Sequence, residues 1–263
     1  MTQPRGVDPR TAGRLRLANL SLAVLHAVQV AVLLALTTSF SIPVTETFPE
    51  GPPGSPAPAP ESLLDLPLGV LVAAFLLLAA LDHLVVALPR VFPLHLSLLA
   101  RSRNPFRWVE YSLSATLMVL LIGLLTGITD VTSVIGIAGA NVAMIMFGAR
   151  MERVNEGRDQ VQWQPFVYGC VAGAFPWLAI TTALVGAEVR GEGAPAFVYG
   201  IFVSLFVLFM SFAVNQWLQF RARSRGGRWD DPVRVEATYL VLSLVAKSAL
   251  AWQVFANVLI EPA

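Results

Sequence analysis

The sequence predicts an all-α membrane protein folded as one bundle of seven transmembrane helices. Hydrophobic residues make up 56% of the 263 positions and charged residues only 13%, whereas a soluble domain carries about a quarter charged residues. The mean hydropathy of +0.66 agrees with this class. Seven apolar runs also reach the roughly 17–25 residues with which an α-helix crosses a bilayer. In chain order they are residues 15–37, 63–88, 106–128, 132–150, 164–187, 196–220 and 234–259.

Helix-start signals accompany two of these runs. The third run is preceded by Asn104 and Pro105, and the seventh by Asp231 and Pro232. Asn and Asp side chains accept hydrogen bonds from the first free N–H groups of a helix, and Pro fits the first turn because no helical hydrogen bond is lost there. We therefore expect both helices to begin at these pairs.

The seven runs and their connections leave no room for a second domain. Residues 1–13 form a polar leader, which we expect in the cytoplasm, and residues 14–260 form the bundle. The first run is too long for the apolar part of a signal peptide. The connection at residues 38–62 contains the proline-rich segment FPEGPPGSPAPAPES. We expect this extracellular connection to be extended or disordered rather than helical.

The distribution of arginine predicts the orientation of the bundle. The chain has 18 basic residues, and all but Lys247 are arginine. Only Arg190 falls on the side of the first connection; the others precede the first run or lie in the second, fourth and sixth connections and the adjoining helix ends. Cytoplasmic segments of membrane proteins are enriched in Lys and Arg. The N-terminus is therefore predicted to be cytoplasmic and the C-terminus extracellular, in a multi-pass protein of the cell membrane.

Several function classes are disfavoured. The single Cys170 lies within the fifth run, so no intrachain disulfide can form. A net charge of +1 without a basic arm argues against a nucleic-acid partner. The sequence also lacks a P-loop, a zinc-type Cys/His spacing and a nucleophile elbow.

Lys247, the only lysine, lies in the middle of the seventh run. An ionisable group inside a bilayer costs about 2.5–3.5 kcal/mol on insertion scales and marks a functional site by default. A lysine amine can lose its proton and condense with a carbonyl to form a Schiff base, whereas a guanidinium cannot. The position therefore favours a covalently bound carbonyl ligand.

Three further ionisable residues are expected in the cytoplasmic half of the bundle with Lys247. We interpret Lys247 as the site of a protonated Schiff base with Glu110 as its counter-ion, because a buried cation needs a nearby anion. His26 and His83 would accept or store the proton. The alternative is a structural ion pair between Lys247 and Glu110, surrounded by core histidines. We expect His95, which lies in an arginine-rich connection, to be an ordinary surface residue.

Neighbouring hydroxyl and aromatic residues agree with a ligand pocket. Ser243 lies one turn before Lys247 and Ser114 one turn after Glu110, so each shares a helix face with the ionisable residue. The aromatic residues that could wall a long apolar ligand are Phe202, Phe206, Phe209, Trp177 and Trp252.

Two motifs, together with His26 and His83, resemble the heliorhodopsins: NPFRWVEYSLSATLM at residues 104–118 and SLVAK at residues 243–247. These retinal proteins have an inverted membrane orientation, and the resemblance covers the whole seven-run region. It implies all-trans-retinal bound to Lys247 and isomerised by light, with Glu110 as counter-ion. It also implies a proton-acceptor network of His26, His83 and Tyr111, a Schiff-base region lined by Ser114 and Ser243, and pocket positions at Met118, Asn141 and Gln216.

The resemblance further implies a light-sensing or signalling role with a slow photocycle and without ion pumping. It implies a homodimer among membrane lipids, and an unknown cytoplasmic signalling protein is the candidate partner. Family members fold the first outside loop into a β-hairpin. Because proline cannot donate a full strand ladder, the sequence argues against this hairpin, or against its full length.

Other functions stay open. A light-driven ion transporter would use the same chromophore, but it needs polar groups toward both faces. The outer half offers only Thr126, Thr129 and Asp130, near its surface. A retinal-free membrane transporter or receptor would use Lys247 and Glu110 as a structural pair, but the inverted repeats or broken helices typical of transporters are not evident. A membrane enzyme would need catalytic residues beyond the lysine.

Overall fold

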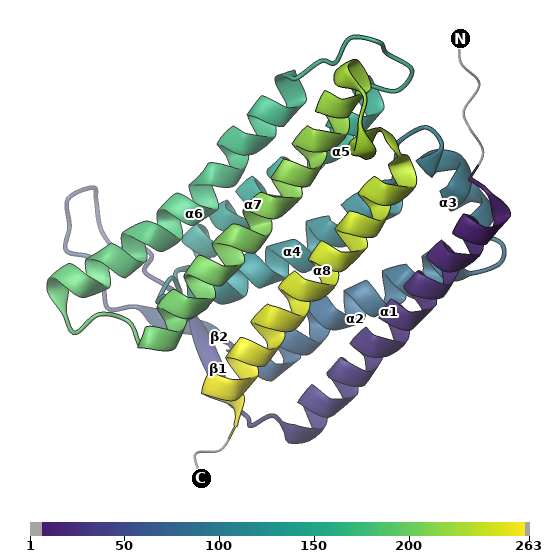
Figure 1. Ribbon diagram of the computed structural model, residues 1–263. Helices are drawn as coiled ribbons and strands as arrows, with labels where there is room; N and C mark the ends of the chain where they lie inside the picture. Colours follow the sequence, from purple (N-terminus) through teal and green to yellow (C-terminus); the bar gives the residue numbers. More distant parts are fainter. Residues whose placement is uncertain (1–6, 261–263) are drawn as a thin grey trace.

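Seven long helices pack side by side in a computed structural model that describes residues 7–260 (Figure 1). All seven are long and apolar enough to cross a membrane, which confirms the predicted fold class. They are α1 Pro9–Leu36, α2 Leu68–Ala87, α4 Pro105–Leu125, α5 Val131–Val154, α6 Gln164–Arg190, α7 Ala196–Arg225 and α8 Pro232–Val254. A π-helical turn, Phe255–Leu259, extends α8. Residues 1–6 of the predicted leader lie outside the described residues, and α1 already begins within the leader.

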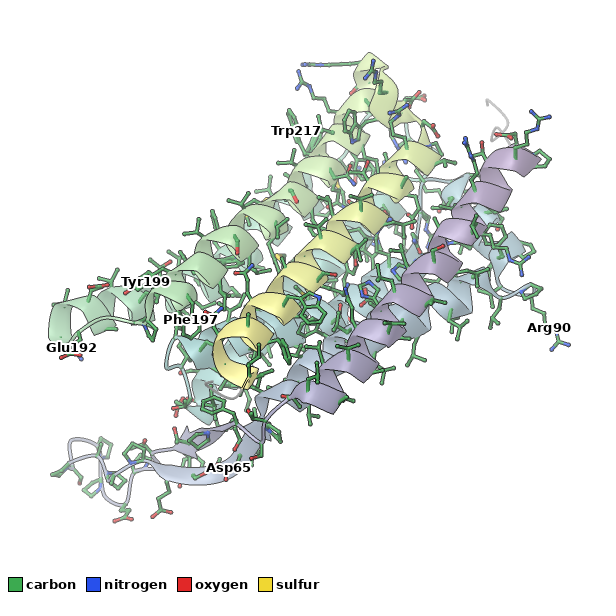
Figure 2. The ribbon with its side chains drawn as sticks, turned by 60° about the horizontal axis from the view of Figure 1, so that its bottom comes forward. Asp65, Arg90, Glu192, Phe197, Tyr199 and Trp217 are labelled. Carbon is green, nitrogen blue, oxygen red and sulfur yellow. The ribbon has the colours of Figure 1, made fainter. Side chains whose placement is uncertain are left out.

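The two ends of the bundle differ in charge. The start of α1, the short helix α3 (Phe92–Leu99) and the α5–α6 and α7–α8 connections lie at one end, and the end of α8 lies at the other (Figure 1). We call the first the arginine-rich end and the second the hairpin end. Arg90 projects from the arginine-rich end, whereas Asp65 and Glu192 lie at the hairpin end (Figure 2). Seven spans place the two termini at opposite ends.

The predicted helix starts are confirmed by their caps. The Asn104 side chain accepts a hydrogen bond from the backbone N–H of Arg107 at 3.2 Å, at the start of α4. The Asp231 side chain accepts one from Val233 N–H at 2.9 Å, at the start of α8. In both helices proline occupies the first turn, where it loses no helical hydrogen bond. The capping side chain accepts from one of the first backbone N–H groups, which have no partner within the helix.

The argument against a hairpin in the first connection was wrong. Strands β1 (Ser41–Glu46) and β2 (Glu61–Pro67) pair antiparallel, and the proline-rich run connects them at residues 47–60. The missing proline N–H groups therefore fall mostly outside the ladder. The second span was also predicted too early, at residue 63, because its first residues belong to β2 and the helix begins at Leu68.

The hairpin is fastened to the end of the bundle. Thr45 N–H donates to the Thr129 carbonyl in the α4–α5 connection at 2.9 Å, and the two threonine hydroxyls lie 3.1 Å apart. Leu68 N–H donates to the Phe40 carbonyl at 3.1 Å. The side chain of Val44, in β1, is buried. These contacts attach the hairpin to the α4–α5 connection and to the start of α2.

The core is divided between an apolar half and a polar half. Leu121 and Ile122, late in α4, belong to the largest cluster of buried apolar side chains, toward the hairpin end. Arg107 and Glu110, early in the same helix, are buried near the arginine-rich end. Burying charge is costly unless it is paired, so the functional contacts are expected in the polar half.

Candidate functional site

Lys247 and Glu110 form a buried ion pair between α8 and α4. The Lys247 Nζ atom lies 3.2 Å from Glu110 Oε1 and 3.3 Å from Oε2, and the two side chains are 4% and 6% exposed. Nζ also donates to Ser243 Oγ at 2.7 Å. Ser243 and Lys247 are four residues apart and therefore share one face of α8. The only lysine thus meets a carboxylate and a hydroxyl inside the bundle.

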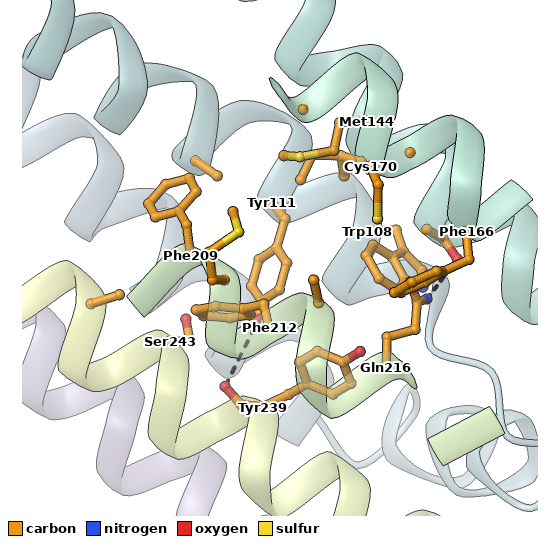
Figure 3. A pocket seen from close by; sticks show the side chains of 18 of the residues that line it. Trp108, Tyr111, Met144, Phe166, Cys170, Phe209, Phe212, Gln216, Tyr239 and Ser243 are labelled. Carbon is orange, nitrogen blue, oxygen red and sulfur yellow. Dashed lines mark hydrogen bonds between the residues drawn. The ribbon is translucent and has the colours of Figure 1, made fainter. Parts of the chain in front are cut away.

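A cavity with mostly apolar walls reaches this lysine. Its walls come from α4, α5, α6, α7 and α8, and Lys247 and Ser243 are among the lining residues. Aromatic rings contribute much of the surface (Figure 3): those of Trp108, Tyr111, Phe166, Phe209, Phe212 and Tyr239. A long apolar aldehyde such as retinal requires both a hydrocarbon-lined space and an amine with which to condense, and these residues provide both.

Glycine shapes one wall of this apolar cavity. A Cβ atom added at Gly148 of α5 would lie 2.5 Å from the Trp108 ring. Gly173 of α6 likewise leaves no space for a side chain beside the Met144 sulfur. Both glycines line the cavity. Their missing side chains let the walls hold an aromatic ring and a thioether at close range.

The predicted pocket residues fall into two groups. Met118 and Gln216 line the apolar cavity, and the Gln216 side chain donates to the Gly148 carbonyl at 3.0 Å (Figure 3). Asn141 is buried but donates to Thr116 Oγ1 at 2.9 Å and is not a lining residue. Ser114 is fully buried, and its hydroxyl has no hydrogen-bond partner among the described residues.

Only one of the five aromatic residues proposed for the wall lines the cavity. Phe209 does so, and its ring packs edge-on against Trp177 at 5.5 Å between ring centres. Phe202 and Phe206 also pack edge-on against the Trp177 ring and do not line the cavity. Trp252 is 38% exposed. Helical spacing alone did not distinguish cavity walls from general packing.

The remaining predicted residues surround the ion pair. The centre of the Tyr111 ring lies 5.0 Å from Lys247 Nζ, and the Tyr111 hydroxyl donates to the Tyr239 carbonyl at 3.4 Å. His26 and His83 stack with ring centres 5.8 Å apart and planes within 7°. His83 Nδ1 lies 3.0 Å from the Asn19 side-chain oxygen.

A second, polar cavity of about 10 Å³ lies beside the ion pair. A space of this size can hold about one water molecule if polar groups surround it. Glu110 and Ser243, which both contact Lys247, are also part of its lining. The other lining residues are Asn19, Asp82, His83, Val86, His95, Asn104, Arg107, Tyr111, Glu236, Tyr239 and Leu240. His26 is not among them.

The heliorhodopsin family model matches residues 15–259, nearly the whole chain. The chain belongs to the heliorhodopsin family. It is therefore a multi-pass membrane protein, and membership implies a retinal chromophore. A comparison with curated protein sequences gave no match.

Solved rhodopsin structures share the fold of this heliorhodopsin. One similar structure is a light-driven proton pump from Leptosphaeria maculans, with a TM-score of 0.66 and 16% identity over 96% of this chain and 97% of that chain. Exiguobacterium sibiricum rhodopsin gives a TM-score of 0.62 at 13% identity, over 94% and 95% of the two chains. Thermophilic rhodopsin from Rubrobacter xylanophilus gives 0.59 at 16%, over 93% and 95%. At these identities the likeness concerns the fold alone.

This heliorhodopsin also buries an arginine at the start of α4, next to the arginine-rich connection that precedes this helix. Arg107 pairs with Glu152 of α5 at 2.5 Å and with Glu236 of α8. The Asn104 backbone N–H donates to Glu152, and the Asn104 side chain donates to Glu236, each at 2.8 Å. The guanidinium faces the Tyr239 ring at 3.8 Å. The sequence pattern that could have predicted this cluster is the presence of two carboxylates, Glu152 and Glu236, close to the ends of predicted spans.

His95 is not a surface residue. It lies on the inner face of α3 and is 1% exposed, and its ring contacts the rings of Phe92 and Phe106. The expectation failed because α3 was not predicted as a helix. Phe92, His95 and Leu99 follow helical spacing and are all buried, which folds the connection back onto the bundle.

Proposed function

We propose that this heliorhodopsin is a light sensor that carries all-trans-retinal on Lys247 and does not pump ions. The observation that carries the proposal is the position of Lys247 between two unlike cavities. Its side chain lines the apolar cavity, its partner Glu110 lines the polar one, and its partner Ser243 lines both. Retinal bound at Nζ would supply the light-absorbing polyene. Its isomerisation would reorient the N–H group at Nζ and change the acidity of that proton.

The residues around Lys247 then have separate tasks. Glu110 offsets the positive charge on the protonated nitrogen, since an unpaired buried cation would lose its proton. Ser243 accepts the Nζ hydrogen bond and so orients it. Met118 and Gln216, together with the aromatic rings, hold the hydrocarbon chain. His83, with its stacked neighbour His26, accepts a proton released toward the polar cavity.

The apolar half of the core supports sensing rather than pumping. A pump needs proton-carrying groups from Lys247 to both faces of the membrane. On the hairpin side of Lys247, the buried face of α8 continues with Leu250, Ala251 and Val254, all 0% exposed. The hairpin at that end is fastened to the α4–α5 connection. Transfer would therefore start and end in the arginine-rich half, in keeping with a slow photocycle.

The orientation and the partners belong to the same proposal. The arginine-rich end faces the cytoplasm, since Lys and Arg are enriched in cytoplasmic segments. The N-terminus is then cytoplasmic, together with α3 and the polar cavity. The protein acts as a homodimer in the lipid bilayer and passes its signal to a protein at the cytoplasmic face.

The test is visible absorption of the purified protein after addition of all-trans-retinal. We expect a visible band in the wild type and no band in Lys247→Ala or Lys247→Arg, since neither side chain can form the covalent link. A coloured Lys247→Arg protein would reject Lys247 as the attachment site. Extraction of the chromophore in the dark identifies the isomer. A sustained pH change outside cells under continuous light would show pumping and contradict the sensor proposal.

A further inference from the structure

His95 is the one buried histidine that the proposed function leaves unused. Its side chain lines the polar cavity, together with Glu110 and Ser243. Neither ring nitrogen has a hydrogen-bond partner among residues 7–260. A buried polar group without a partner is uncommon and calls for an explanation. An imidazole offers one, because it can both accept and return a proton.

The position of α3 places this histidine between the polar cavity and the arginine-rich surface. The helix lies at the arginine-rich end (Figure 1), with Pro93, Leu94 and Ser97 exposed on its outer face. His95 is on the opposite face, directed into the bundle between the Phe92 and Phe106 rings, with ring centres at 6.2 and 6.3 Å. It is thus a lining residue supplied by a helix that is not one of the membrane-spanning helices.

Burial, aided by the charge of Arg107, keeps His95 neutral before a proton arrives. Burial lowers the pKa of His95 to about 4, and the positive charge of Arg107 acts in the same direction. The titratable groups that line the same cavity are Asp82 and His83 on α2, Arg107, Glu110 and Tyr111 on α4, and Glu236 and Tyr239 on α8. A neutral imidazole beside carboxylates is suited to accept a proton when a nearby charge is displaced.

We infer that His95 is a proton-holding residue of the polar cavity, receiving the proton that leaves the Lys247 nitrogen and later returning it. This inference rests on the proposed function. The N–H bond at Lys247 Nζ breaks and an N–H bond forms at an imidazole nitrogen of His95. The proton passes by way of Glu110, which contacts Nζ and lines the polar cavity, and of a water molecule that this cavity can hold. The positive charge moves with the proton, and no other bond changes. His95 therefore joins His83 as an acceptor on the side nearer the arginine-rich surface.

The first experiment follows the imidazoles in the full chain before retinal is added. The protein has three histidines, so ¹⁵N spectra of the wild type and of His95→Gln identify the His95 resonance by its loss. We expect it to stay neutral at pH 6 and to titrate near pH 4. Titration near pH 6.5, as for a surface imidazole, would overturn the inference without bearing on retinal binding.

The second experiment follows the pigment after a light pulse. In His95→Gln and His95→Phe we expect the state with an unprotonated Lys247 nitrogen to change its lifetime by about tenfold or more, as for loss of an acid–base group. The pH dependence of its decay should flatten, while the colour in the dark is retained. Phe106→Leu is the matched control for packing around the imidazole and should keep the wild-type pH profile.

The two ideas fail in different ways. If the wild type forms a visible band but both His95 variants decay with the wild-type rate and pH profile, His95 holds no proton and only this inference is lost. If Phe106→Leu reproduces the effect of His95→Gln, the effect comes from packing and the inference is again rejected. If the wild type forms no visible band, the proposed function falls, and this role falls with it.

Discussion

The guanidinium carbon of Arg107 lies 3.8 Å from the centre of the Tyr239 ring, and that tyrosine lines both cavities. The Trp108 ring, 5.1 Å from the same carbon, also lines the apolar cavity, so aromatic side chains separate the buried cation from that cavity. Glu152 and Glu236 hold the other edges of the guanidinium. This cluster joins α4, α5 and α8 where the polar half of the core begins.

Removing the arginine should strongly destabilise the protein. In Arg107→Gln two buried carboxylates lose their shared cation, and breaking a buried pair typically costs about 3–5 kcal/mol. Arg101→Gln is the control, because Arg101 is 60% exposed and pairs with Glu156 at only 3.7 Å; exposed pairs contribute at most about 1 kcal/mol. Unfolding of the retinal-free proteins in detergent measures both. Equal losses would show that the buried cluster contributes no special stability.

Neutralising the proposed counter-ion should change the colour. In Glu110→Gln the anion beside Lys247 Nζ is lost, so less photon energy is needed to move positive charge along the polyene, and the absorption band should shift strongly to the red. Glu192→Gln, exposed at the hairpin end, should leave the band in place. Absorption spectra of the two pigments decide the matter. An unchanged band in Glu110→Gln would assign the counter-ion to another group.

A methyl group on the cavity wall should hinder pigment formation. In Gly148→Ala the new Cβ meets the Trp108 ring at 2.5 Å, so this ring, which lines the cavity proposed for retinal, must move. Gly139→Ala on the same helix meets nothing within 4 Å, and alanine is the better helix former by about 1 kcal/mol. The yield of visible pigment should fall in the first variant and stay unchanged in the second. Full pigment in Gly148→Ala would argue that retinal lies elsewhere.

The stacked histidines should affect kinetics more than colour. The hydrogen-bond partners of Lys247 Nζ among the described residues are Glu110 and Ser243, and neither His26 nor His83 is one of them. His83 does line the polar cavity together with Glu110. In His26→Ala and His83→Ala we expect altered lifetimes of light-generated states and nearly unchanged dark spectra. Flash spectroscopy measures the first and steady absorption the second. A large colour change with normal kinetics would place these rings against the chromophore instead.

Acid should destabilise the wild type through His95. Its pKa is lowered by burial from the ordinary 6.5 to about 4. Between these values the unfolded chain holds the extra proton, so the folded state loses stability as the pH falls from about 6.5 to about 4, by up to about 3 kcal/mol. His95→Gln lacks this contribution. The difference in unfolding free energy between the two proteins should therefore shrink at low pH, and parallel pH profiles would contradict the prediction.

The sequence predicted the helices because hydropathy and capping act locally. Asn104 and Asp231 cap the helices they were expected to start. It missed the strands because residues 61–67, ESLLDLP, join an apolar helix without a break, and a short apolar run does not distinguish strand from helix. Tertiary pairing with β1 decides the conformation there.

The candidate site was predictable where one residue type carried the chemistry. Lys247 was found because a lone lysine in an apolar run is costly. Arg107 and His95 were missed for one reason: both lie near arginine-rich connections, where basic residues usually face water. Their burial follows from α3 folding inward and from two carboxylates on distant helices, neither of which sequence spacing reveals.

The apolar filling of the hairpin half also has an electrical meaning. A proton exchanged between the Lys247 nitrogen and the polar cavity crosses only part of the insulating layer, and it must come back by the same route. A light pulse should then produce a brief displacement current followed by an opposite one of equal area, with no steady current under constant illumination. Membrane voltage would act weakly on the step, because a full elementary charge crossing 100 mV corresponds to only about 2.3 kcal/mol.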